Sequence, residues 1–131
     1  MKNVHTCLLC LGSNVRADYH LKEAEAALNA AFPGIRWGRV VPTRAENTVP
    51  ESADYLNRAA SFDTSLGEKE VRAVLKDIEK ANGRKEGDKE KGTVPLDIDL
   101  LRYDSRMPKP QDFSKPYVRK ALEAFPENRE G

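Results

Sequence analysis

The chain has 131 residues, 39% of them hydrophobic and 33% charged, and its 22 basic and 21 acidic side chains leave a formal net charge of +1. This length fits a single domain over 1–131, with a core at about 4–104 and a C-terminal extension at about 105–131. The balanced charge and the lack of any apolar run near the roughly 20 residues that span a bilayer argue against nucleic-acid and membrane partners. We therefore expect a soluble, cytoplasmic and monomeric protein.

The first part of the chain predicts a strand followed by a helix. The apolar run over 5–11 is typical of a buried strand, and Gly12-Ser13-Asn14 after it is a turn sequence. Apolar residues then recur at helical spacing over 21–32, and Pro33-Gly34 is expected to end that helix. The pattern therefore predicts a strand–turn–helix unit.

Cys7 and Cys10 have the C-x-x-C spacing of a redox pair, but their position argues against that role. Redox pairs stand at the start of a helix, where the thiolate is stabilised, whereas these two lie within the predicted first strand. Residues three apart on a strand point to opposite faces. We therefore expect two reduced cysteines in the core.

The middle of the chain predicts two further strands and a second helix. A strand over 35–41 leads into 42–53, which holds two prolines and many polar residues and is expected to be a long loop. The next strand is expected over 54–63. Ser65-Leu66-Gly67-Glu68 then has the Ser-x-x-Glu pattern of a helix capping box, and apolar residues follow at helical spacing over 71–78.

The chain after this helix alternates between polar segments and short regular elements. Gly83 is placed to end the helix, and the charged segment 85–91 predicts a loop. Beyond Asp104 the chain is rich in proline and polar residues until a short helix expected over 116–125. The last residues, 126–131, are expected to fray.

The strand predicted over 94–101 carries the strongest chemical signal. Its apolar residues fall on one face, and Asp97 and Asp99 fall side by side on the other. Two neighbouring carboxylates repel each other unless a cation or a proton lies between them. Oxygen ligands suit Mg²⁺, which commonly uses one or two carboxylates plus substrate phosphates. The strand therefore predicts a site for metal-assisted phosphate chemistry.

The element order β-α-β-β-α-β is typical of an α+β, ferredoxin-like fold, in which both helices pack on one face of an antiparallel sheet. The residues expected to face the helices are Leu56, Ala60, Phe62, Leu96, Ile98 and Leu100. The residues expected to lie together on the uncovered face are Tyr55, Asn57, Asp97 and Asp99. This polar group is the predicted functional site.

Five segments together resemble a known family. They are Leu11-Gly12-Ser13-Asn14, Tyr55-Leu56-Asn57, Ile78-Glu79, Gly83-Arg84 and Leu96-Asp97-Ile98-Asp99. Their order and spacing resemble those of the 6-hydroxymethyl-7,8-dihydropterin pyrophosphokinases, enzymes of folate biosynthesis. The resemblance covers about 5–104. It implies a ferredoxin-like core and the transfer of diphosphate from ATP to the hydroxymethyl group of the pterin, with AMP as the other product.

The resemblance also implies roles for individual residues. Asp97 and Asp99 would hold two Mg²⁺ ions that bridge the ATP phosphates, and Arg84 would act with them as a catalytic residue on the phosphates. The pterin would be bound by Asn57, Tyr55 and Thr43. The nucleotide would be bound by Glu79, Arg84, Lys91 and Tyr117.

The chain departs from the family pattern just before the acidic strand. The family carries a Trp-Gly-Pro-Arg element there, but Lys91 stands in place of the tryptophan and Val94 in place of the arginine. The family also has an Arg-x-Phe whose ring stacks on the pterin, and no phenylalanine follows Arg119 at that spacing. An alternative is therefore a divergent member that binds pterin or nucleotide without efficient turnover.

The same element order also occurs in RNA-recognition domains. Those domains present stacking aromatic residues on their central strands. This chain instead places Asp97 and Asp99 on the sheet, and carboxylates repel phosphate unless a metal is bound. We therefore expect no binding of single-stranded RNA.

Overall fold

An antiparallel sheet organises the computed structural model, which describes residues 4–44 and 54–125. The strand order is β2-β4-β1-β5, and β3 also pairs with β4. The strands are β1 (His5–Ser13), β2 (Arg36–Trp37), β3 (Val41–Thr43), β4 (Tyr55–Thr64) and β5 (Asp97–Tyr103). All four strand pairings are antiparallel, which confirms the predicted ferredoxin-like α+β fold.

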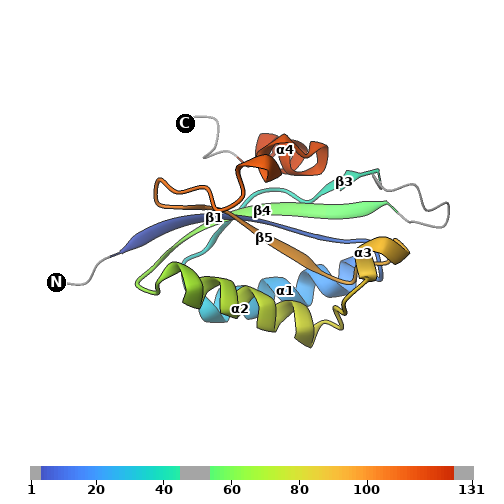
Figure 1. Ribbon diagram of the computed structural model, residues 1–131, viewed down its shortest axis with the longest axis horizontal. Helices are drawn as coiled ribbons and strands as arrows, with labels where there is room; N and C mark the ends of the chain where they lie inside the picture. Colours follow the sequence, from blue (N-terminus) through green and yellow to red (C-terminus); the bar gives the residue numbers. More distant parts are fainter. Residues whose placement is uncertain (1–3, 45–53, 126–131) are drawn as a thin grey trace.

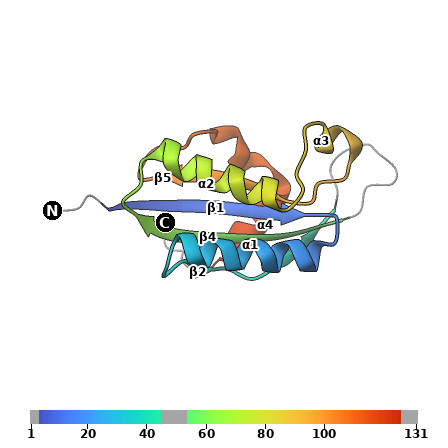
Figure 2. The same ribbon diagram turned by 90° about the horizontal axis from the view of Figure 1, so that it is seen from below.

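Two long helices, α1 (Ala17–Ala31) and α2 (Glu68–Ala81), cover one face of the sheet (Figures 1 and 2). Among the side chains that join them to the sheet are Phe32 and Phe62, whose stacked rings have centroids 4.1 Å apart. Five of the six residues predicted for this face are buried in this core, and Leu56 is partly buried against it. The alternating pattern therefore assigned this face correctly.

The opposite face of the sheet was predicted to be uncovered, and that prediction is wrong. The helix α4 (Pro116–Glu123), preceded by a 3₁₀ turn η1 (Pro110–Ser114), lies across it (Figure 1). A second apolar cluster joins α4 to the sheet and consists of Leu8, Cys10, Ala59, Leu101, Val118, Ala121, Leu122 and Phe125. The central strand β1 is apolar on both faces, so both faces need a cover to keep these side chains out of water.

The two cysteines follow the prediction. Cys7 belongs to the cluster on the α1 and α2 face, and Cys10 belongs to the cluster under α4. Both thiols are free and buried. Burial raises the pKa of Cys7 to about 12 and raises that of Cys10 above its ordinary value. Neither thiol is therefore a reactive thiolate at neutral pH.

The strand predicted over 35–41 is instead divided into β2 and β3. Gly38 lies between them, and a Cβ at this position would stand 3.0 Å from Cδ1 of Phe125. The backbone here therefore lies directly against the end of the α4 segment. Thr43 belongs to β3 and not to the predicted long loop, whereas most of that loop, 45–53, and the end of the chain, 126–131, lie outside the described residues.

The ends of α2 differ in how well they were predicted. The helix begins after Gly67, whose N–H donates to Oε1 of Glu70 at 2.9 Å, so the predicted capping box of Ser65 and Glu68 is wrong. Gly83 follows the helix with a φ of +90° and ends it as predicted.

The predicted loop 85–91 contains a short helix, α3 (Asp88–Lys91). In the described ranges no helix has the length and apolar character needed to cross a membrane.

The stacked phenylalanines give a test of the core. We expect Phe62→Ala to lower the free energy of unfolding by about 3–5 kcal/mol, because it removes a fully buried ring and leaves a cavity. Urea unfolding followed by circular dichroism measures the loss. Val4→Ala is the control, since Val4 is 63% exposed, and should change stability by less than about 0.5 kcal/mol. An equal effect of both substitutions would contradict the packing described for this core.

Candidate active site

Asp97 and Asp99 begin β5 and point to the face that also carries α4. The register places Asp97 opposite Gly12 and Asp99 opposite Cys10 on the neighbouring strand β1. The face predicted for the pair is therefore confirmed, although the α4 segment lies beside it. Within the described residues, no group of three or more His, Cys, Asp or Glu side chains could enclose a metal ion. Two carboxylates fit a Mg²⁺ ion whose other ligands are phosphate oxygens and water.

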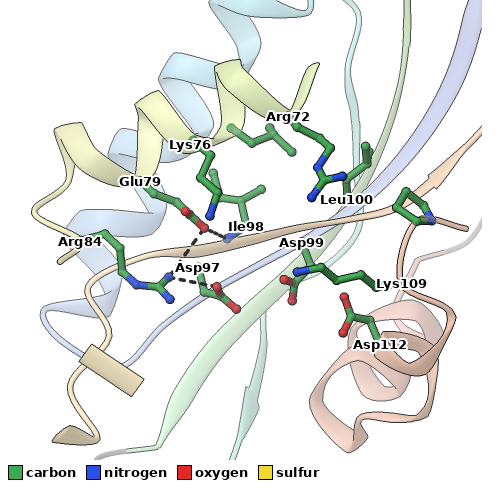
Figure 3. A pocket seen from close by; sticks show the side chains of 12 residues that line it. Arg72, Lys76, Glu79, Arg84, Asp97, Ile98, Asp99, Leu100, Lys109 and Asp112 are labelled. Atoms are coloured by element: carbon green, nitrogen blue, oxygen red, sulfur yellow. Dashed lines mark hydrogen bonds and ion pairs between the residues drawn. The ribbon is translucent and has the colours of Figure 1, made fainter. Parts of the chain in front are cut away.

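Arg84 connects the end of α2 to the start of β5. Its Nη1 donates to the backbone oxygen of Leu96 at 2.9 Å and to Oδ1 of Asp97 at 3.0 Å. The same nitrogen lies 3.7 Å from Oε2 of Glu79. The positive φ of Gly83 turns the chain out of α2 immediately before this arginine. The structure therefore brings together Arg84, Glu79 and Asp97, three residues predicted for the site (Figure 3).

Glu79 is a buried carboxylate that holds the backbone of β5. Its Oε2 accepts the N–H of Ile98 at 2.7 Å, between the two aspartates. Burial raises the pKa of Glu79 above its ordinary value, and Asp97 raises it further, although the Ile98 N–H and Arg84 act in the opposite direction. Because this hydrogen bond fixes the backbone at Ile98, it also restrains Asp97 and Asp99 on either side. Glu79 therefore has a positioning function in addition to lining a pocket.

Asn57 lies on the other side of Gly12 from Asp97. The registers place Gly12 opposite both residues, so the three form one row across β4, β1 and β5. Nδ2 of Asn57 donates to Oγ1 of Thr43 at 2.6 Å, and its buried Oδ1 has no hydrogen-bond partner in the described part of the chain. A buried acceptor without a donor costs about 1–3 kcal/mol, which a ligand N–H would recover.

Two tyrosines form an aromatic pair next to this row. The rings of Tyr55 and Tyr117 are nearly parallel, with an interplanar angle of 13° and centroids 6.3 Å apart. The hydroxyl of Tyr117 donates to Oδ2 of Asp99 at a long 3.4 Å. Burial raises the pKa of Tyr117, and the charges of Asp99 and Asp97 raise it further, so the phenol stays protonated. Tyr117, predicted to contact the nucleotide, thus lies opposite the tyrosine predicted to contact the pterin.

A pocket of about 180 Å³ passes along the outer edge of β5 (Figure 3). It contains Glu79, Arg84, Asp97 and Asp99 from the prediction. It also contains polar residues that the sequence reasoning missed, namely Arg72, Lys76, Lys109 and Asp112. The i, i+4 spacing of Arg72 and Lys76 could have placed both on one side of α2. No sequence pattern indicated Lys109 or Asp112, because only the folding of the η1 segment against β5 brings these residues to the site.

Lys91 differs from the other predicted nucleotide residues. It ends the short helix α3, is exposed, and is not among the residues that line this pocket. Asn14 instead fixes the chain that follows α3. Its Nδ2 donates to the oxygen of Gly92 at 2.8 Å, and its Oδ1 accepts the N–H of Val94 at 2.7 Å. The turn after β1 therefore anchors the segment that the sequence had shown to depart from the family pattern.

Comparisons with known proteins agree with these motifs. The family model described as 7,8-dihydro-6-hydroxymethylpterin-pyrophosphokinase matches residues 8–126. The mitochondrial folate synthesis bifunctional protein of Pisum sativum is 36% identical over 97 residues, which is 73% of this chain and 19% of that protein. The corresponding protein of Arabidopsis thaliana is 32% identical over 100 residues, 76% of this chain and 18% of that protein. The chain thus spans about a fifth of the length of these relatives.

Gly12 provides a test of the row that joins the two halves of the site. A Cβ at Gly12 would stand 2.6 Å from Oδ1 of Asn57, a buried side chain whose Nδ2 is held by Thr43, so this amide would have to shift. We expect Gly12→Ala to weaken ligand binding at Asn57 at least tenfold, measured as the Kd of a 6-hydroxymethylpterin analogue. Gly67→Ala is the control, since its Cβ would meet Glu70 at an ordinary 3.4 Å. Unchanged binding in Gly12→Ala would show that this row does not form the ligand site.

Proposed function

The chain belongs to the 7,8-dihydro-6-hydroxymethylpterin-pyrophosphokinase family, and we propose on this premise that it transfers diphosphate from ATP to a 6-hydroxymethyl-7,8-dihydropterin. The observation that carries the proposal is the row of Asn57, Gly12 and Asp97 across three strands. This row places a heterocycle-binding amide and a carboxylate pair on one face, with only a glycine between them. A pterin held at Asn57 would direct its hydroxymethyl group towards Asp97 and Asp99.

The carboxylate pair fits two Mg²⁺ ions, which would neutralise charge on the phosphates and align the reacting oxygens. Other residues of the chain would hold Asp97 and Asp99 in the positions that the metal ions require. Arg84 restrains Asp97 through Oδ1, and Glu79 restrains the backbone between the aspartates through Ile98. The pterin hydroxyl attacks the β-phosphorus, the bond from that phosphorus to the oxygen of the AMP group breaks, and the hydroxyl proton passes to a nearby carboxylate.

We further propose that Tyr55 and Tyr117 form the two walls of the pterin site. Face-to-face contact on both sides of a flat ring at about 3.5 Å each needs a separation of about 7 Å. The ring centroids are 6.3 Å apart and the rings are nearly parallel, so a flat ring enters between them once the two tyrosines move slightly apart. Tyr117 would then supply the aromatic wall that the sequence lacked at the Arg-x-Phe position, in place of its predicted contact with the nucleotide.

A second candidate function is binding of pterin or nucleotide without efficient turnover. The segment before β5 favours it, because Glu86, Asp88 and Glu90 offset its three lysines, whereas a loop that closes over a triphosphate should carry an excess of positive charge. Saturable binding of the pterin and MgATP without formation of AMP would support this candidate. Turnover would exclude it.

The acidic pair gives the test of the enzyme proposal. We expect the wild-type protein to form AMP from ATP and 6-hydroxymethyl-7,8-dihydropterin in the presence of Mg²⁺. Asp97→Asn should lower kcat/KM by on the order of 10²–10³, because the amide can still accept from Arg84 but no longer carries the charge that the reaction requires. AMP is quantified by chromatography. Asp77→Asn, an exposed change on α2, is the control and should leave the rate unchanged.

The aromatic pair gives a second test. We expect Tyr117→Ala to raise the KM for the pterin roughly five- to 100-fold, since a stacked base contributes about 1–3 kcal/mol to binding. Tyr117→Phe keeps the wall and removes only the hydroxyl, so its KM for the pterin should stay within about threefold of the wild type. If Tyr117→Ala instead raises the KM for ATP and leaves that for the pterin unchanged, the residue belongs to the nucleotide site.

A further inference from the structure

The source of positive charge for the nucleotide phosphates is not explained by the residues predicted for the site. Arg84 already donates to Leu96 and to Asp97 and lies near Glu79. Lys91 does not line the pocket at β5. A triphosphate binds best where cations surround it, since charge-assisted hydrogen bonds are about twice as strong as neutral ones. Further cations should therefore exist elsewhere on the pocket wall.

The pocket contains such cations on both sides of β5. β5 is the outermost strand of the sheet, so a nucleotide in this pocket can pass over its edge. Arg72 and Lys76 come from α2, on the side of Ile98 and Leu100, whereas Lys109 comes from the segment before η1 and lies beside Asp99 (Figure 3). The edge of β5 thus has Lys76 on the side of α2 and Lys109 on the side of the carboxylates, although these two lysines are far apart in sequence.

Within the described part of the chain, Lys76 and Lys109 are also the cations of this pocket that have no close ion pair, although the charge of Lys76 acts to lower the pKa of Glu79. Among the described residues, neither ammonium group has a hydrogen bond or an ion pair within 4.0 Å. Lys115, which follows η1, is already paired, since its Nζ lies 2.9 Å from Oδ1 of Asp112. Arg72 has a weak pair with Glu68 at 4.0 Å. Lys76 and Lys109 can therefore approach an anion without breaking an existing pair.

Exposed lysines on a helix are ordinarily only solvated, and α2 offers that comparison directly. Lys69 is an exposed lysine of the same helix that does not line this pocket. Lys76 differs because it lines the pocket, together with Leu75 and with Arg72 one helical turn earlier on α2. Position, and not residue type, therefore distinguishes Lys76 from the other lysines of the helix.

We propose that Lys76 and Lys109 bind the phosphates of the nucleotide and supply the excess of positive charge that the charge-balanced segment before β5 does not provide. This inference rests on the proposed function, because it concerns the nucleotide of that reaction. It assigns the ligand-binding charge to α2 and to the segment before η1. The two lysines contact the phosphate chain from opposite sides of the β5 edge. Asp97 and Asp99 lie next to the phosphate that is transferred.

Calorimetric titration with α,β-methylene-ATP and Mg²⁺ tests the inference without turnover. We expect Lys76→Gln with Lys109→Gln to raise the Kd of the analogue at least tenfold, as expected for the loss of two charge-assisted contacts. The dependence of log Kd on log salt should also become shallower. Binding of AMP should weaken less than binding of the analogue. The control is Lys69→Gln with Lys120→Gln, which makes the same change of charge outside the pocket and should leave the Kd within twofold.

Each outcome separates the inference from the proposed function. If the wild type binds the analogue and the Lys76/Lys109 variant binds it within twofold, the inference is wrong and the proposed function stands. The inference is also wrong if the control variant weakens binding equally, because the effect is then one of overall charge. If the wild type binds no analogue, the proposed function fails, and this inference fails with it. Melting temperatures by circular dichroism confirm that all variants are folded.

Discussion

The repulsion between Asp97 and Asp99 is the constraint on which the site depends. Two carboxylates on one face of a strand need positive charge nearby, and the fold supplies part of it through Arg84 at the end of α2. Glu79 then fixes the strand backbone between the two aspartates through the Ile98 N–H. The folded chain therefore holds Asp97 through its side chain and fixes the backbone that carries both aspartates.

The central strand β1 connects this pair to the remainder of the site. Gly12 has Asp97 on one side and Asn57 on the other, and its missing side chain leaves room for the Asn57 amide, whose Oδ1 would stand 2.6 Å from a Cβ at this position. Asn14, two residues later, holds the segment that leads into β5. The turn sequence that contains Gly12 and Asn14 therefore sets the distance between Asn57 and Asp97. It also anchors the segment before β5, which departs from the family pattern. A change at β1 would consequently affect the pterin side and the phosphate side together.

Packing on the second face of the sheet gives the site its enclosure. The apolar cluster beneath α4 brings Tyr117 opposite Tyr55, and the η1 segment before α4 brings Lys109 and Asp112 to the edge of β5. These residues are more than 40 positions from Tyr55 and more than 25 from Lys76 in the sequence. The covered face thus explains how a chain with a charge-balanced segment before β5 can still form a pocket that contains cations and an aromatic pair.

The sequence by itself determined the order of the elements, the inward face of the sheet, the two core cysteines and the acidic pair, because alternation and helical spacing are local properties of a chain. It also placed Arg84 and Glu79 by their resemblance to a family motif. The tertiary structure decided what no local pattern records: the division of the 35–41 strand at Gly38, the cover over the second face, and the arrival of Lys109 and Tyr117 at the site. These depend on contacts between segments distant in sequence, and only the folded chain brings such segments within reach of one another.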